Sequence, residues 1–448
     1  MQKSMRKRFH KYYDSGMKYA VAALILAIPL YPKFPFMRVP GSQVYIRLED
    51  FLIFGIAALW IWGNAGELFK KPLRTFTFSF GLFWAVGLVS LLSAILVTHS
   101  VTPLIGALHF VRRIQYMIVF FIGATSVKSS KDIAFYIKCM LLVTLYTFVF
   151  GVGQKHFAWP IITTQNAEYA KGIALQYMPW GHVVSTFAGH YDLATYIVLV
   201  SPVFILLLVS KKSILESLFE GIAVRKTRII LLIALALNYW LLINAASRIA
   251  FAAYLGVGSL ALIFTKRFRM LVAFVVVSLI VTFTTSSNLV DRYMNIFNVT
   301  VNKTLSAVTE FVIHTAHAQE VQEDRSTNIR LNVEWPRAIR ALEKNPFLGT
   351  GYSSITLATD NGFLRILGEV GLLGFLAFGI IILTLVSALI RAIAFEKAHV
   401  VRRLFAAAML AALPGILLNM VFLDILEASK FAIMFWLMMG CAVARYEA

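Results

Sequence analysis

Four polar residues occur at the start of a long apolar stretch, in the segment "DNGFLRILGEVGLLGF". They are Asp360, Asn361, Arg365 and Glu369. Asn361, Arg365 and Glu369 follow one another at steps of four residues, which stacks them along one side of a helix. Asp360 and Asn361 precede the first turn, where either side chain can cap it. A helix start favours anions, and Arg365 adds a positive charge close to it. The pattern favours a phosphate site at a membrane boundary; capping plus an Arg365–Glu369 ion pair is the alternative.

Arginines at other boundaries of apolar stretches are further candidates for binding an anion. An ionisable side chain inside a membrane costs on the order of several kcal/mol unless it has a partner or a water-filled cavity. Arg112 and Arg113 lie in the first turns of one apolar run, where anion binding and contact with lipid head groups are both open. Ser247 and Arg248 occupy a short hairpin between two such runs. There we favour a cation facing a lipid phosphate over a simple interfacial anchor.

The segment "EDRSTNIRLNVEWPRAIRALEKNPFLGTG" contains the remaining candidates. Arg325 and Arg330 are interpreted as functional residues. Two later arginines fit the solvated face of a helix: Arg337 and Arg340. The aromatic side chains of Trp335 and Tyr352 suit stacking on sugar rings or a place in an interfacial aromatic belt. "NPFLGTG" predicts the end of the helix, because Pro and Gly stop helices and permit tight turns.

The composition indicates the class of protein that must position these residues. Hydrophobic residues make up 59% of the 448 residues and charged residues only 14%, whereas a soluble protein carries about 25% charged residues. The net charge of +20 is spread over short connections between apolar runs, which is typical of a membrane orientation signal. The chain is therefore expected to be a polytopic, all-α membrane protein and not a nucleic-acid-binding protein.

The apolar runs predict about twelve transmembrane helices within a single integral membrane domain, 1–448. They lie at roughly 17–32, 49–63, 75–98, 105–125, 132–153, 191–210, 229–246, 249–265, 270–286, 363–390, 404–423 and 430–444. Alternate connections are rich in Lys and Arg, which predicts that those connections and both termini are cytoplasmic. The opposite side then carries a loop at 154–190 and a larger catalytic loop at 287–362, between the ninth and tenth spans.

Metal and disulfide chemistry are not expected. Cys139 and Cys441 both lie in apolar runs, and no CxxC motif is present. His314 and His317 are three residues apart but have no obvious third ligand, so we interpret them as ordinary loop residues. No cofactor is predicted.

The motifs together resemble the O-antigen ligase and polymerase superfamily, bacterial membrane glycosyltransferases of the Wzy type. That family has an Arg and a Trp before NP-x-x-G-x-G, then a polar pair with Asn, then Glu-x-Gly-x-x-Gly. The matching residues here are Arg330, Trp335, Asn345–Gly351, Asp360–Asn361 and Glu369–Gly371–Gly374. The segments "STFAGHYDLATYIVLV" and "AASRIAFAAYLG" also resemble family blocks.

The resemblance implies a GT-C-like glycosyltransferase that takes a glycan from a polyprenyl-pyrophosphate carrier at the outer face of the bacterial inner membrane. Ligase members pass a finished polymer to lipid A-core of lipopolysaccharide, and polymerase members pass a growing chain to the next lipid-linked repeat unit. The resemblance also implies that Arg248 and Arg330 hold the pyrophosphate, and that the polar pair supplies a base. Besides the lipid-linked oligosaccharide and membrane lipid, the candidate partners are a chain-length regulator and a repeat-unit flippase.

One position departs from the ligase pattern, which usually has His-Asn where this chain has Asp360-Asn361. A His can act as a base near neutral pH, whereas an Asp with an ordinary pKa of about 3.9 is a weaker base. Asp360 is then either the base or a residue that orients the acceptor hydroxyl. The departure favours a polymerase over a ligase.

The expected function is that of an O-antigen or exopolysaccharide polymerase. A sugar hydroxyl attacks the anomeric carbon of the donor, and fixed guanidinium groups stabilise the departing pyrophosphate without a metal. The expected catalytic residues are Arg248, Arg330 and Asp360. The expected substrate-binding residues are Arg325, Asn361, Arg365, Glu369, Arg112, Arg113, Trp335, Tyr352 and Ser247. The alternatives are an O-antigen ligase, a protein O-oligosaccharyltransferase with the same donor, and a non-enzymatic transporter of lipid-linked glycans.

Overall fold

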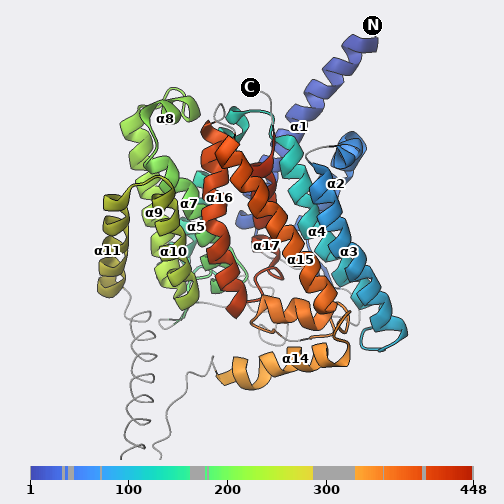
Figure 1. The fold of residues 1–448 in the computed structure, drawn as a ribbon. Coiled ribbons are helices and arrows are strands. Elements are labelled where there is room, and N and C mark those ends of the chain that lie inside the picture. Colours follow the sequence, from blue (N-terminus) through green and yellow to red (C-terminus); the bar gives the residue numbers. More distant parts are fainter. Residues whose placement is uncertain are drawn as a thin grey trace, which may run out of the picture.

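The computed structural model describes residues 2–32, 36–38, 45–70, 73–161, 177–178, 181–285, 328–356, 358–395 and 400–445. These residues form an almost entirely helical molecule (Figure 1). The fold class predicted from the sequence is thus confirmed at this level.

A helix coincides with each of the twelve predicted spans. They are α1 (Gln2–Leu30), α2 (Leu48–Asn64), α3 (Leu73–Leu96), α4 (Pro103–Ser126), α5 (Ser130–Phe157), α7 (His190–Leu208), α9 (Val224–Ala245), α10 (Arg248–Phe264), α11 (Phe268–Thr285), α15 (Gly362–Phe395), α16 (Val400–Phe422) and α17 (Ser429–Val443). Within the described residues, eight helices are long and apolar enough to cross a membrane, and α10 and α17 are shorter apolar helices. Twelve crossings remain a prediction.

The other elements are short. They are β1 (Met37–Arg38), β2 (Tyr45–Ile46), η1 (Ala65–Phe69), α8 (Lys212–Leu218), the π-helix η2 (Arg330–Glu334) and α14 (Trp335–Lys344). β1 and β2 pair antiparallel, with Met37 opposite Ile46. This ribbon is an exception to the all-α expectation, since the sequence pattern between the first two spans did not indicate strands.

Two helices lie in the middle of the bundle. Every residue of α17 is buried, and so is nearly all of α7. Most residues of both helices are apolar, as expected of a helix surrounded by other helices. α17 packs mainly against α4, and α7 packs against α9, α10 and α16. In contrast, few residues of α11 are buried and most are exposed, which suits a helix that faces lipid.

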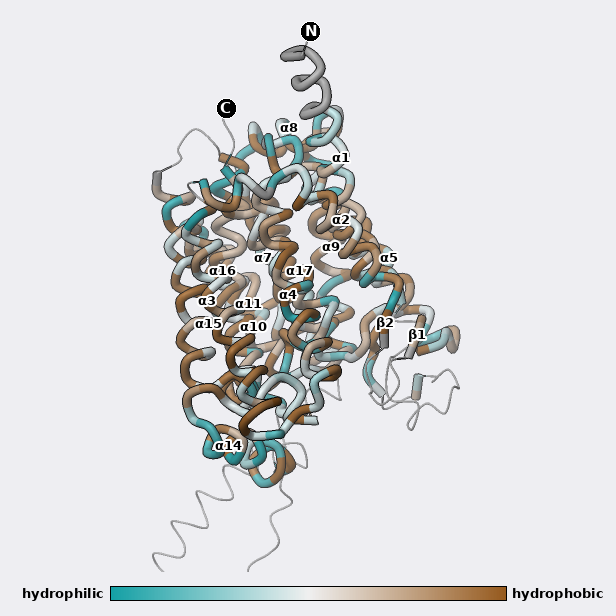
Figure 2. Tube along the Cα trace, turned by 90° about the vertical axis from the view of Figure 1, so that its right-hand side faces the viewer, coloured by the Kyte–Doolittle hydropathy of each residue, from teal (hydrophilic) through white to brown (hydrophobic). Residues whose placement is uncertain are grey.

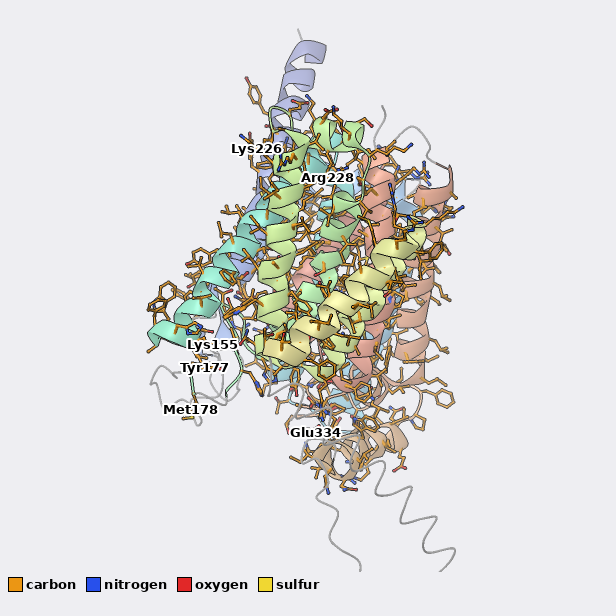
Figure 3. The ribbon with its side chains drawn as sticks, turned by 90° about the vertical axis from the view of Figure 1, so that its left-hand side faces the viewer. Lys155, Tyr177, Met178, Lys226, Arg228 and Glu334 are labelled. Carbon is orange, nitrogen blue, oxygen red and sulfur yellow. The ribbon has the colours of Figure 1, made fainter. Side chains whose placement is uncertain are left out.

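The two ends of the bundle differ in what they carry. Hydrophobic residues follow the middle of the helices, whereas hydrophilic residues gather around α8 at one end and α14 at the other (Figure 2). Both termini lie at the α8 end (Figure 1). Lys226 and Arg228 lie at that end as well, and Glu334 lies at the opposite end (Figure 3). Lys226 and Glu334 are therefore at opposite ends of the bundle, and the sides of the membrane on which these ends lie remain a prediction.

α15 is broken at Gly371, where the backbone adopts φ 74° and ψ −173°. The "NPFLGTG" loop packs into this break. The Thr350 amide donates to the Gly368 carbonyl at 2.9 Å, and the Gly351 amide donates to the Glu369 carbonyl at 2.8 Å. A Cβ atom at Gly371 would collide with the Phe347 carbonyl, and glycine alone adopts this backbone conformation readily. The loop thus fixes the start of α15, which carries the polar residues of the candidate site.

Candidate functional site

Arg330 and Asp360, thirty residues apart in sequence, form an ion pair. Nε and Nη2 of Arg330 donate to Oδ2 of Asp360 at 3.1 Å and 2.9 Å. The two side chains are 11% and 28% exposed, so the pair is largely shielded from solvent while its carboxylate remains accessible. The structure thus brings together two of the three residues that the sequence singled out as catalytic.

Arg330 begins the π-helix η2, which ends two residues before Pro336. Pro336 has no N–H to donate to the carbonyl four residues earlier. One residue earlier, the Trp335 amide donates to the Arg330 carbonyl, five residues back, which is the π-helical pattern. Pro336 then lies in the first turn of α14, where a proline is tolerated. The proline therefore shapes the segment that positions Arg330.

Asp360 has a left-handed backbone, with φ 46°, and Asp424 holds it there. The Asp424 carboxylate accepts hydrogen bonds from the amides on either side, from Thr359 at 2.7 Å and from Asn361 at 3.1 Å. The side chain of Asn361 caps α15, because its Oδ1 accepts from the Phe363 and Leu364 amides. Asn361 is therefore the cap of the helix. The Asp360 carboxylate does not cap it and binds Arg330 instead.

A second carboxylate, that of Glu334, belongs to the same cluster of charges. Burial and the nearby charge of Asp360 raise the pKa of Glu334 to about 7, although Arg330 opposes the rise. Burial also raises the pKa of Asp360 above its ordinary value, against the effect of Arg330. Tyr191, in the first turn of α7, lies within hydrogen-bonding reach of Arg330. The cluster thus draws on η2, α7 and the turn before α15.

Arg365 lies in a separate, more buried network of charges. Its Nη2 is 3.3 Å from Oε1 of Glu369, so the pair predicted from their spacing is present. Its Nη1 is 3.0 Å from Oδ2 of Asp424, and its Nε is 3.6 Å from Oε1 of Glu427. Three carboxylates therefore surround one guanidinium group, which satisfies its charge near the apolar interior. Asp424 connects this network to the backbone of Asp360.

Glu427 also joins Arg113 to that network. Arg113 donates to the Glu427 carboxylate and, through Nη1, to the Leu426 carbonyl at 3.2 Å. Burial raises the pKa of Glu427, but Arg113 and Arg365 outweigh it and lower the pKa to about 2. Arg113 thus has a protein partner of opposite charge, while the neighbouring Arg112 is partly buried.

The two aromatic candidates differ in their surroundings. Tyr352 is only 1% exposed, and the Arg113 guanidinium lies 5.8 Å from the centre of its ring. Tyr352, Arg113, Arg365 and Glu369 line one small cavity together with apolar side chains of α3, α4, α15 and α17. Trp335 is partly buried at the start of α14. Tyr352 consequently packs inside the molecule, and Trp335 lies beside the Arg330 segment.

Arg248 is the first residue of α10, and Ser247 caps that helix. The buried Ser247 hydroxyl accepts from the Ala250 amide at 3.3 Å. α10 packs against α7, whose first turn carries Tyr191. In addition, the Val183 amide donates to the Asn244 carbonyl at 3.0 Å, which joins the segment before α7 to the end of α9. Arg248 therefore starts a helix next to the one that contacts Arg330.

The remaining arginines and histidines considered in the sequence lie on α14 or outside the described residues. Arg325 lies outside the described residues, as do His314 and His317. Arg340 is exposed, as expected for a solvated face, but Arg337 is partly buried and its Nη1 is enclosed. No group of three His, Cys, Asp or Glu side chains suited to a metal occurs among the residues that the structure describes.

The sequence analysis missed Asp424, Glu427, Glu334 and Tyr191. The first two occur in "VFLDILEASK" between the last two spans. Two acids in a short connection of an otherwise apolar hairpin are a signal of burial with a partner, and that signal was available. Tyr191 carries no such signal, because tyrosine is common at the ends of membrane helices.

Comparison with known families adds one match. Residues 229–379 match a family model described as O-antigen ligase. The matched segment includes α9, α10, η2, α14 and the start of α15, and with them Arg248, Arg330 and Asp360. No curated protein matches the chain.

Proposed function

Since the chain belongs to the O-antigen ligase and polymerase superfamily, whose members are glycosyltransferase-like enzymes, we propose that it is a polysaccharide polymerase. It takes a growing glycan from a polyprenyl-pyrophosphate carrier and transfers it to a sugar hydroxyl of the next lipid-linked repeat unit. The product is an O-antigen or an exopolysaccharide. The observation that carries the proposal is the Arg330–Asp360 pair within the matched segment.

The charges of the site suit a pyrophosphate leaving group. Three helices, α7, α10 and α15, start at the end of the bundle that carries α14 (Figure 1). The N-terminus of a helix carries a partial positive charge and free amides, which favour an anion. Arg248 and Arg330 add guanidinium groups, which bind phosphate oxygens in a bidentate manner better than lysine does. Negative charge that develops on the departing pyrophosphate is stabilised there.

The proposed reaction is a displacement at the anomeric carbon of the donor. An acceptor hydroxyl forms the new bond, and the carbon–oxygen bond to the pyrophosphate breaks. Arg248 and Arg330 neutralise the leaving group, so the proposed chemistry requires no metal or cofactor. Asp360 fixes the guanidinium of Arg330 and orients the acceptor hydroxyl. Trp335, Ser247 and Arg325 are further candidates for binding the substrate.

The proposed location is the bacterial inner membrane, with both termini in the cytoplasm and the site at the outer face. The position of both termini at the α8 end, opposite Glu334, supports this orientation (Figures 1 and 3). The basic connections at the α8 end support it further, because cytoplasmic loops carry an excess of Lys and Arg.

A ligase is the second candidate, and the description of the matching family favours it. Such an enzyme shares the donor and passes the polymer to lipid A-core, or to a protein in an O-oligosaccharyltransferase. The Asp at position 360 favours the polymerase, because the ligases that this chain resembles have a His there. A transporter of lipid-linked glycans is less favoured, because the Arg330–Asp360 pair lies at one end of the bundle and not at its middle.

The test uses purified protein in lipid vesicles, supplied with the lipid-linked repeat unit extracted from cells that lack the gene. A polymerase converts this substrate alone into a ladder of products that differ by one repeat unit. A ligase produces no ladder, but attaches preformed polymer when lipid A-core is added. Recovery of the unchanged repeat unit under both conditions would contradict both enzymatic functions.

A further inference from the structure

Glu334 is the last residue of η2, four positions after Arg330, and lies at the α14 end of the molecule (Figure 3). Its side chain is only partly exposed, and its Oε2 atom is enclosed. Within the described part of the chain, that oxygen accepts no hydrogen bond. A carboxylate oxygen without a donor in a shielded place binds a proton readily, because nothing else stabilises its charge.

The groups that face Glu334 come from each neighbouring element. Arg330 and Arg337 lie on its own helical segment, Asp360 lies on the turn before α15, and Asp424 lies on the connection between α16 and α17. The two carboxylates disfavour a charged Glu334, and the two guanidinium groups favour it. Burial adds to the effect of the carboxylates, so the balance favours the protonated form more than in an ordinary glutamate.

Among the described residues, Asp360 differs from Glu334 in having a direct hydrogen-bonding partner. Its Oδ2 accepts two N–H groups from one guanidinium, at 3.1 Å and 2.9 Å, and a carboxylate stabilised in this way is a weak base. Two neighbouring carboxylates with different environments are a recurring arrangement in which one serves as the acid or base and the other stays ionised. Of the two, only Glu334 has an enclosed oxygen that no N–H group of the described residues stabilises, which makes it the better proton acceptor.

We propose that Glu334 is the catalytic base, which removes the proton of the acceptor sugar hydroxyl. This inference rests on the proposed glycosyl transfer. The hydroxyl oxygen forms a bond to the anomeric carbon, and its proton moves to the carboxylate of Glu334. The bond between that carbon and the pyrophosphate oxygen breaks, and its electron pair leaves with the lipid pyrophosphate. Solvent then takes the proton from Glu334, whose side chain is partly exposed.

The first test compares Glu334→Gln with Glu343→Gln. Glu343 is exposed on α14, close in sequence to Glu334, so its change controls for loss of charge on the same segment. With the extracted lipid-linked repeat unit as substrate, Glu334→Gln is expected to lower kcat about 100-fold or more, the usual contribution of a general base. Binding of the lipid-linked donor is expected to remain, because Arg330 is untouched. Elongation at the rate of Glu343→Gln would overturn the proposal.

The second test is the pH dependence of kcat, which a purely structural role would not affect. Glu334 must be deprotonated to act as a base, so kcat of the parent is expected to rise with pH, with a midpoint near the Glu334 pKa of about 7, and to level off at higher pH. Glu334→Asp should retain a rising limb at a lower rate, and Glu334→Gln should lose it. A limb that persists in Glu334→Gln, or that disappears in Asp360→Asn instead, would overturn the assignment.

The two hypotheses fail in different ways. Elongation by the parent together with a fully active Glu334→Gln would overturn the role of Glu334 alone. No elongation by the parent, in the presence of intact donor and a folded protein, would overturn the proposed polymerase and the role of Glu334 with it.

Discussion

The carboxylate of Asp424 binds the guanidinium of Arg365, with 3.0 Å between Oδ2 and Nη1. The same carboxylate accepts the amides of Thr359 and Asn361. One side chain thus anchors a buried arginine in α15 and the strained backbone of Asp360. Asp424 also lies outside the segment that matches the O-antigen ligase model, so the candidate site depends on the last helical hairpin as well.

Replacement of Asp424 is therefore expected to affect both stability and activity. Asp424→Ala removes one partner of a buried ion pair, which typically costs about 3–5 kcal/mol. Asp424→Asn keeps an oxygen acceptor for an amide and should lose less. Thermal unfolding of the purified proteins measures the stability. The expected unfolding temperature is highest for the parent, lower for Asp424→Asn and lowest for Asp424→Ala. An Asp424→Ala protein that unfolds at the temperature of the parent would refute this role.

The break in α15 leads to a prediction about glycine. Gly371→Ala should prevent correct folding, because the new Cβ collides with the Phe347 carbonyl and the backbone has a positive φ. Gly379→Ala in the same helix is the control, since a Cβ there meets nothing within 4 Å. The readout is the fraction of solubilised protein that elutes as a single species in gel filtration. An equal single-species fraction for the two variants would contradict the proposed need for glycine at the break in α15.

Lys430 lies at the start of α17 and is completely buried. Its Nζ donates to the Pro29 carbonyl at 3.0 Å and to the Thr186 carbonyl at 2.5 Å, so it connects three separate parts of the chain. Lys430→Met should lower the free energy of unfolding by about 1–3 kcal/mol for each carbonyl left without a donor. Lys344→Met, at an exposed position of α14, should leave it unchanged. Denaturant titration in detergent compares the two, and equal midpoints would contradict the stabilising role of Lys430.

The sequence was sufficient to locate the helices at the twelve predicted spans. A long apolar run has one stable form in hydrocarbon, because its backbone must satisfy its own hydrogen bonds. The Arg365–Glu369 pair and the Asn361 cap were also predictable, because both depend on local spacing along one helix. The catalytic roles of Arg248, Arg330 and Asp360 were inferred from the family resemblance. The contact between Arg330 and Asp360 is seen only in the structure.

The remaining features depend on contacts between distant segments. Asp424 meets Arg365 across 59 positions, and Arg113 meets Glu427 across 314. Neither contact can be inferred from the spacing of residues along one helix, because the two partners belong to different helices or loops. The π-helix before Pro336 was not predicted either, since a proline permits a kink, a stop or a wider turn. Tertiary packing decides among these outcomes.

The central claim is that Arg330 stabilises the pyrophosphate leaving group, and the rate of glycan elongation by Arg330→Ala tests it most directly. Arg340→Ala, at an exposed position of α14, is the matched control. Loss of one donor to a developing negative charge typically lowers kcat about 100- to 1000-fold. We therefore expect Arg330→Ala to fold but to accumulate single repeat units, while Arg340→Ala elongates like the parent. A folded Arg330→Ala protein that elongates glycan at the parental rate would contradict the account.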